Sequence, residues 1–184
     1  MANKEALREL QSRLAERLQA ARTQQRSRSW LAVESGGRGF LFPLKEAGEI
    51  FAMAPVVPVA HAQAWFLGVA NLRGHLHGVV DLAGFLGVKR PDRPSEVSRE
   101  QSRLVAFNAA TEINCALLVD RLAGLRNEEQ LTAQAPEASM CPAFVGTRYR
   151  DAAGRLWQEL NLAELAIDDA FLAIVGRPAQ PANA

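Results

Sequence analysis

The sequence has little of the chemistry on which small enzymes, disulfide proteins and membrane proteins depend. Its two cysteines, Cys115 and Cys141, form no CxxC pair. Cys115 lies inside an apolar run, which favours a small buried hydrophobic residue over a reactive thiol. No apolar run reaches the ~18 residues of a membrane span, and the charged N-terminus lacks a secretory hydrophobic region. We therefore expect a cytoplasmic protein without disulfides.

An excess of either charge is also absent. The 21 basic and 20 acidic residues leave a formal charge of +1, and the chain has a single tyrosine. A nucleic-acid groove normally needs a clearly basic face with aromatic residues for stacking, so we expect no nucleic-acid partner. The sequence also contains no G-x-S-x-G element, P-loop or Rossmann glycine pattern. We therefore expect neither catalysis nor a cofactor.

Two groups of polar residues need a specific interpretation. His75 and His77 are two positions apart on a predicted strand, so both point to one face and supply half of a metal site. A metal site needs at least a third ligand, and His61 is the only other histidine. We favour an exposed strand face and no metal. Asp81 and Asp120 follow apolar strands, where helix capping or turn stabilisation explains both.

The N-terminal segment, residues 1–28, has the pattern of an amphipathic helix. Its apolar residues recur every three or four positions and form one narrow stripe. They are Leu7, Leu10, Leu14 and Leu18, followed by Ala21. Two interpretations stay open: the helix lies against its own domain or frays in solvent, or it docks on a partner.

From Trp30 onward the pattern changes to short strands separated by turn signals. Residues 48–60 contain Pro55 and Pro58, which suits a loop or an edge strand. The polar stretch around 89–102 is the best internal linker, and it divides the chain into two β-rich halves. The other predicted strands cover 30–35, 40–44, 65–72, 75–82, 103–109, 113–127, 144–150 and 156–162. A C-terminal helix follows at 162–176, and 177–184 is a tail.

The hairpin at residues 66–87, "FLGVANLRGHLHGVVDLAGFLG", carries a specific pattern. Its N-L-R-G turn followed by an alternating strand ending in D-L resembles the signature of CheW-like domains. The V-D of residues 119–120 and the Glu-Ile of 49–50 support this resemblance, which covers about residues 30–175. Within the family, the chain looks most like the PilI-type coupling proteins.

The resemblance implies a mainly β fold of two five-stranded, SH3-like barrels packed side by side, with residues 29–176 as the domain. It implies an adaptor between the cytoplasmic tip of a methyl-accepting chemoreceptor and the regulatory domain of a CheA-type histidine kinase. The PilI-type likeness implies control of type IV pili and twitching, with recruitment to membrane-bound receptor arrays. A flagellar-type coupling protein is the alternative, and an oligonucleotide-binding small barrel is a weaker one.

The same resemblance implies two sets of contact residues. The coupling hairpin consists of Asn71, Leu72, Arg73 and Gly74. The receptor-binding groove between the barrels consists of Ala47, Glu49, Ile50, Leu118, Val119, Arg121 and Leu122. For the aliphatic groove residues, a place in the barrel core is an equal alternative.

Within the hairpin, Gly74 suits a positive φ and Asn71 can hydrogen-bond the turn backbone. Arg73 presents a planar fork of donors, either to a partner or as a structural tie between the barrels. One departure from the family pattern is the strand at 156–162, which carries Gln158 and Glu159 where an aliphatic strand is usual.

Overall fold

The computed structural model describes residue 13 and residues 28–88, 100–135 and 141–175. Most of the predicted N-terminal helix, most of the predicted linker and the C-terminal tail therefore lie outside the described residues. None of the described helices is long and apolar enough to span a membrane.

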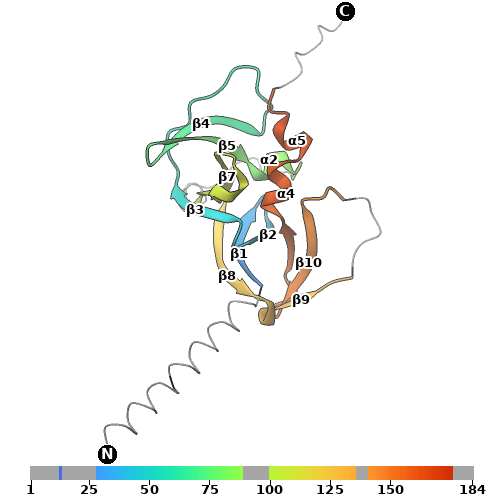
Figure 1. The fold of residues 1–184 in the computed structure, drawn as a ribbon. Helices are drawn as coiled ribbons and strands as arrows, with labels where there is room; N and C mark the ends of the chain where they lie inside the picture. Colours follow the sequence, from blue (N-terminus) through green and yellow to red (C-terminus); the bar gives the residue numbers. More distant parts are fainter. Residues whose placement is uncertain (1–12, 14–27, 89–99, 136–140, 176–184) are drawn as a thin grey trace, which may run out of the picture.

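The described chain is mainly β, as predicted, and forms two curled sheets with short helices at their junction (Figure 1). The first sheet has the order β8-β1-β2-β11-β10-β9. Its strands are β1 (Ser29–Ser35), β2 (Arg38–Pro43), β8 (Arg121–Asn127), β9 (Leu131–Ala133), β10 (Val145–Asp151) and β11 (Leu156–Leu160). The short strand β9 makes this sheet six-stranded, one strand more than expected.

The second sheet has five strands, as expected, in the order β3-β6-β7-β5-β4. Its strands are β3 (Ala47–Ala52), β4 (Phe66–Leu72), β5 (His75–Asp81), β6 (Arg103–Phe107) and β7 (Cys115–Val119). The helical elements are α2 (Leu82–Phe85), η1 (Ala109–Thr111), η2 (Glu128–Gln130), α4 (Leu162–Ala166) and α5 (Asp169–Leu172).

The two sheets do not correspond to the chain on either side of 89–102. β1 and β2 precede the linker but belong to the first sheet, with the C-terminal strands. β6 and β7 follow the linker but belong to the second sheet, with β3, β4 and β5. Two parallel pairings, β2 with β11 and β5 with β7, join these distant segments. Local patterns identify strands but not their non-local partners, which is why the sequence suggested two consecutive halves.

The central strands bury both of their faces, so alternate side chains enter different cores. In β6, Leu104 and Ala106 belong to a cluster inside the second sheet. Val105 and Phe107 belong to the largest cluster, which lies between the sheets and includes Leu31, Val33, Phe40, Phe42, Val80, Leu117, Val119, Leu160 and Phe171. A third cluster fills the first sheet, around Trp30, Leu41, Tyr149 and Trp157.

The predicted C-terminal helix consists of two short helices rather than one continuous helix. Asn161 caps α4 by accepting a hydrogen bond from the Glu164 N–H at 3.0 Å, and Asp168 caps α5 in the same way at the Phe171 N–H. The second cap redirects the chain so that the Phe171 ring stacks near Trp65 and Phe107 in the inter-sheet cluster. Burial of Phe171 therefore overrides the continuous helical pattern.

Two glutamate carboxylates stabilise the fold through hydrogen bonds, one buried at the junction of the sheets and one half-buried in the first sheet. Glu46, between β2 and β3, accepts hydrogen bonds from the Leu162 and Ala163 N–H groups at 2.8 and 3.4 Å, and so satisfies the start of α4. Glu159 accepts a hydrogen bond from the Trp30 indole at 2.7 Å. This contact accounts for the polar residue in β11, which pairs with both β2 and β10.

Candidate functional site

The β4–β5 hairpin is closed by a two-residue turn. Leu72 pairs with His75, and both turn residues, Arg73 and Gly74, have positive φ values of 49° and 88°. This is the backbone of a type I′ turn, whose twist matches the flanking strands. The Gly74 N–H donates to Asn71 Oδ1 at 2.8 Å. The predicted roles of Gly74 and Asn71 in the turn are therefore confirmed.

Arg73 connects this turn to β3 of the same sheet. Its guanidinium lies 2.5 Å from the Glu49 carboxylate and 5.9 Å from the centre of the Phe51 ring. The tie joins two edges of the second sheet, so the alternative of a tie between the two sheets is wrong. The Arg73 side chain is 75% exposed. An exposed pair adds at most about 1 kcal/mol of stability, so its main effect is to hold the exposed guanidinium beside Glu49.

The same turn borders an open hollow of about 490 Å³. It is lined by Glu49, Phe51, Leu72, Arg73, His75, His77, Asn108, Glu112, Ile113 and Asn114, among others. His77 Nδ1 lies 3.1 Å from the His75 carbonyl oxygen, and its ring lies 6.2 Å from that of Phe51. Among the residues that the structure describes, no three His, Cys, Asp or Glu side chains are placed to hold a metal ion.

The predicted groove residues separate into two groups. Val119 is 0% exposed and belongs to the inter-sheet core, and Leu118 is buried inside the second sheet. Leu118 and Val119 therefore lie in the core, which was the alternative to the groove. β7 buries both of its faces and leaves no aliphatic side chain for a partner.

The other predicted groove residues lie at the surface or at the margin of the core. Ala47 on β3 and Leu122 on β8 are partly buried against the same inter-sheet cluster. Glu49, Ile50 and Arg121 are exposed. The two strands therefore flank one apolar seam between the sheets, with charged residues beside it.

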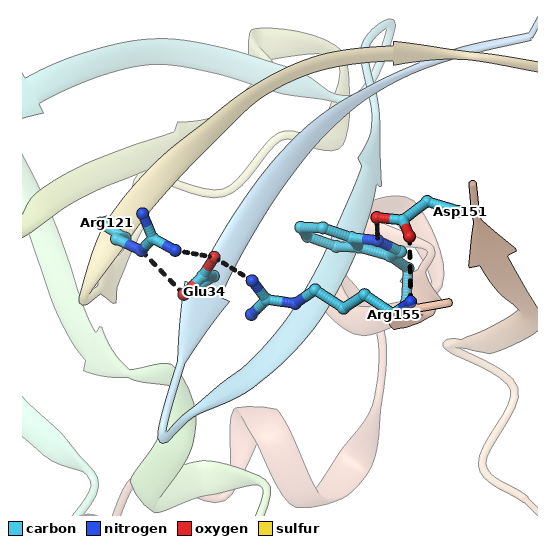
Figure 2. A network of polar contacts seen from close by, with 5 residues as sticks. Glu34, Arg121, Asp151 and Arg155 are labelled. Carbon is cyan, nitrogen blue, oxygen red and sulfur yellow. Dashed lines mark hydrogen bonds and ion pairs between the residues drawn. The ribbon is translucent and has the colours of Figure 1, made fainter. Parts of the chain in front are cut away.

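Arg121 belongs to a polar network that the sequence did not reveal (Figure 2). Glu34 on β1 accepts two hydrogen bonds from Arg121, at 2.8 and 2.5 Å, and one from Arg155 at 2.5 Å. Burial by itself would raise the pKa of Glu34, but the hydrogen bonds and charges of Arg155 and Arg121 outweigh it. The pKa of Glu34 consequently lies below its ordinary value of 4.5.

The network continues across Trp157. The Arg155 guanidinium lies 4.7 Å from the centre of the Trp157 ring, whose indole N–H donates to Asp151 at 2.9 Å. That bond, with those from the Arg155 and Ala153 N–H groups, lowers the pKa of Asp151 below its usual value despite partial burial. Asp120 accepts from the Gly36 N–H at 2.7 Å and so stabilises the β1–β2 turn.

The position of Glu34 in the sequence pattern of β1 could have indicated that it has a polar partner. The alternation of β1 places Glu34 on the same face as Trp30 and Ala32, which belong to the core of the first sheet. An acidic residue on a core-facing position needs a cationic or hydrogen-bond donor partner. The identity of that partner is not contained in the local sequence, because Arg121 and Arg155 are 87 and 121 positions away. Asp81, expected as a cap, occupies the N-cap position of α2 without a capping side-chain hydrogen bond.

The free energy of unfolding should depend on the ionisation of Glu34. Because its pKa is lower in the folded than in the unfolded chain, its stabilising contribution is complete above about pH 4.5 and is lost as the pH falls through the folded value. In urea titrations between neutral and acid pH, Glu34→Gln should have a shallower loss of stability than the wild type. Glu129→Gln, at an exposed position, is the control and should retain the wild-type profile. Equal profiles for wild type and Glu34→Gln would contradict the assignment.

Cys115 is buried, and desolvation raises the pKa of its thiol to about 12. This agrees with its interpretation as a small apolar residue. Neither cysteine forms a disulfide, and Cys141 is exposed.

The sequence of this chain is similar to a known domain family and to several known proteins. The sequence model of the CheW-like domain family matches residues 29–169. The chain is 30% identical over 166 residues to the protein PilI of Pseudomonas aeruginosa, with 87% of each chain covered. It is 35% identical over 68 residues to a probable chemotaxis protein CheW of Rhizobium etli, covering 37% of this chain and 44% of that one.

Among solved structures, the fold is similar to the scaffolding protein TtCheW from Thermoanaerobacter tengcongensis. The TM-score is 0.59 at 14% identity, with 73% of this chain and 88% of that chain covered. At this level of identity the likeness concerns the arrangement of the strands alone. It agrees with the two curled sheets described above.

Proposed function

The chain belongs to the CheW-like domain family, a family of scaffold proteins and not of enzymes, and from this we propose that it couples two specific partners. One partner is the cytoplasmic tip of a methyl-accepting chemoreceptor. The other is the regulatory domain of a CheA-type histidine kinase. The protein acts by holding these partners in a fixed geometry, without a cofactor or a chemical step.

The observation that carries this proposal is the preformed coupling hairpin. Asn71 fixes the turn and Glu49 orients the exposed Arg73 fork before any partner arrives. A guanidinium already held beside Glu49 loses less conformational entropy on binding a carboxylate or carbonyl group of a partner than an unrestrained one does. A preoriented donor on an exposed turn is what a docking contact requires.

The receptor tip, a helical hairpin, would lie along the seam flanked by β3 and β8. Ala47, Ile50 and Leu122 supply apolar contact, and Glu49 and Arg121 set the register through their charges. This proposal uses the exposed and marginal members of the predicted groove and leaves Leu118 and Val119 in the core.

We infer that the output is twitching motility driven by type IV pili, with the protein recruited from the cytoplasm to receptor arrays. The likeness to PilI, which extends over 87% of the chain, supports this output over a flagellar one. Deletion of the gene in its own organism should shrink the twitching zone and leave the swimming zone unchanged. A swimming defect with normal twitching would favour the flagellar alternative.

The binding test is a calorimetric titration of the protein against the kinase regulatory domain from the same organism. We expect saturable binding with a Kd near one micromolar, about −8 kcal/mol, which arrays then reinforce by avidity. Arg73→Ala removes the fork, and Arg73→Lys keeps its charge. Arg150→Ala removes an exposed arginine of β10 in the first sheet as a matched control. Absence of binding to any CheA-type kinase of the cell would contradict the proposal.

The receptor arm is tested with the same proteins and a receptor signalling fragment. Ile50→Glu should weaken receptor binding about tenfold or more, because a charge replaces an apolar contact. Leu156→Glu, at an exposed leucine of β11 and away from β3 and β8, should have no effect. If Arg73→Ala weakens only the receptor titration, the hairpin acts at the receptor and not at the kinase.

A further inference from the structure

Residues 50–72 contain no aspartate, glutamate, lysine or arginine, and Glu49 and Arg73 border this stretch. It includes the end of β3, the connecting segment and β4. The connecting segment exposes Met53, Val57 and Val59, and Val57 is 64% exposed. Exposed apolar surface without charges is uncommon on a monomer and marks an interaction site.

The C-terminal part of the described chain extends this surface. The Gln63 N–H donates to the Ile174 carbonyl at 2.8 Å, and Ala62 and Val175 form an isolated β-bridge. Leu172 is exposed, and Val175 is 77% exposed. We call the set the uncharged edge: Met53, Val57, Val59, Leu172 and Val175.

The backbone along this edge does not favour the addition of a further strand. The N–H and C=O groups of Val57 both pair with Val69 on β4, at 2.8 and 2.9 Å. Pro55 and Pro58, on either side, have no N–H to offer to an incoming strand. A partner must therefore be recognised by side-chain contact, as when an amphipathic helix packs its apolar face on a surface.

The N-terminal segment of the chain has the complementary chemistry. Leu7, Leu10, Leu14 and Leu18 recur at helical spacing and form one narrow apolar stripe between charged positions. These residues lie outside the described structure, and a stripe of this kind is complementary to an apolar surface. The β3–β4 part of this edge carries no charged residue, so it accepts leucines without leaving a buried charge unpaired, and the exposed Asp169 of α5 borders it beside Leu172.

We propose that the leucine stripe of one copy docks on the uncharged edge of a second copy. The segment joins the fold at Ser29 in the first sheet, at the end of the molecule away from the β3–β4 connection and α5 (Figure 1). This placement favours a neighbouring copy over the same copy as the acceptor. The contact is between two different surfaces, so it either closes reciprocally into a dimer or continues into a chain of copies.

The inference is separate from the proposed coupling function. The uncharged edge includes neither Arg73 nor Ile50, and self-association supplies a contact that kinase and receptor binding do not require. Its physical value is avidity, because linked copies present several coupling hairpins at once.

Sedimentation equilibrium of the full chain tests the proposal, over about 1 µM to about 1 mM, a range that corresponds to −8 to −4 kcal/mol. The wild type should rise in mass with concentration. Leu14→Glu in the stripe and Val57→Glu on the edge should each raise the dissociation constant at least tenfold. The matched controls are Ser12→Glu, on the helix face opposite the stripe, and Leu125→Glu, an exposed leucine of the first sheet. Both controls should associate as the wild type does.

Mixing the two defective variants gives the decisive result. Leu14→Glu retains an intact edge and Val57→Glu retains an intact stripe, so the mixture should form a heterodimer that neither variant forms alone. A monomeric wild type at all concentrations, or unchanged association of Val57→Glu, would overturn the proposal. A loss of kinase binding by Val57→Glu with unchanged self-association would assign the edge to the kinase instead. All variants are first checked for native circular dichroism, since Val57 is exposed and its substitution should leave the fold intact.

Discussion

Replacing Trp157 by alanine is expected to lower the free energy of unfolding by about 4 kcal/mol. Trp157 is 1% exposed and is the central residue of the core inside the first sheet. Its ring lies directly over Gly39 on β2, where no side chain intervenes. Removal of the indole leaves a cavity over the core face of β2 and β11, whose parallel pairing joins segments far apart in the chain.

The Trp157→Phe variant separates the ring from its hydrogen bond. It keeps most of the apolar volume and loses the bond to Asp151, so we expect a loss of about 1 to 2 kcal/mol. Urea unfolding followed by far-UV circular dichroism measures both variants. A loss below about 2 kcal/mol for alanine would mean that the first sheet closes over the cavity or that Trp157 is peripheral to its stability.

Gly68→Ala is the second substitution with a large expected effect, about 3 kcal/mol. Gly68 has a φ of 134°, a conformation that L side chains rarely adopt. A Cβ added there would lie 2.1 Å from the Val57 carbonyl oxygen, which is backbone and cannot rotate away. The substitution therefore both strains β4 and displaces the segment that carries the uncharged edge.

Gly74→Ala is the matched control, because its φ is also positive, at 88°, while no atom lies within 4 Å of an added Cβ. We expect it to cost about 1 kcal/mol, the strain alone. The two variants thus distinguish conformational strain from steric contact in the same hairpin. Equal losses of stability for the two variants would show that the approach of Val57 to β4 contributes little to the fold.

Local sequence patterns were sufficient for several features of this protein. The alternation of β4 and β5 around an Arg-Gly pair identified the hairpin, and the roles of Asn71 and Gly74 followed from turn chemistry alone. The absence of catalytic and nucleotide-binding motifs pointed away from an enzyme. The N-L-R-G motif indicated the family, because the motif is contiguous and its backbone demands are local.

Tertiary structure decided the features that depend on distant partners. Which strands form each sheet, the burial of both faces of β7, and the removal of Val119 from the groove follow from pairings between segments far apart in the chain. The hydrogen bonds of Glu34 with Arg121 and Arg155 exist only because the fold brings those distant segments together. The break between α4 and α5 similarly reflects burial of Phe171 between the sheets. The alternation of apolar residues and the preference for a turn depend on residues close together in the sequence, so the sequence predicts them. The surface that a side chain packs against depends on long-range pairing, where burial outweighs local preference.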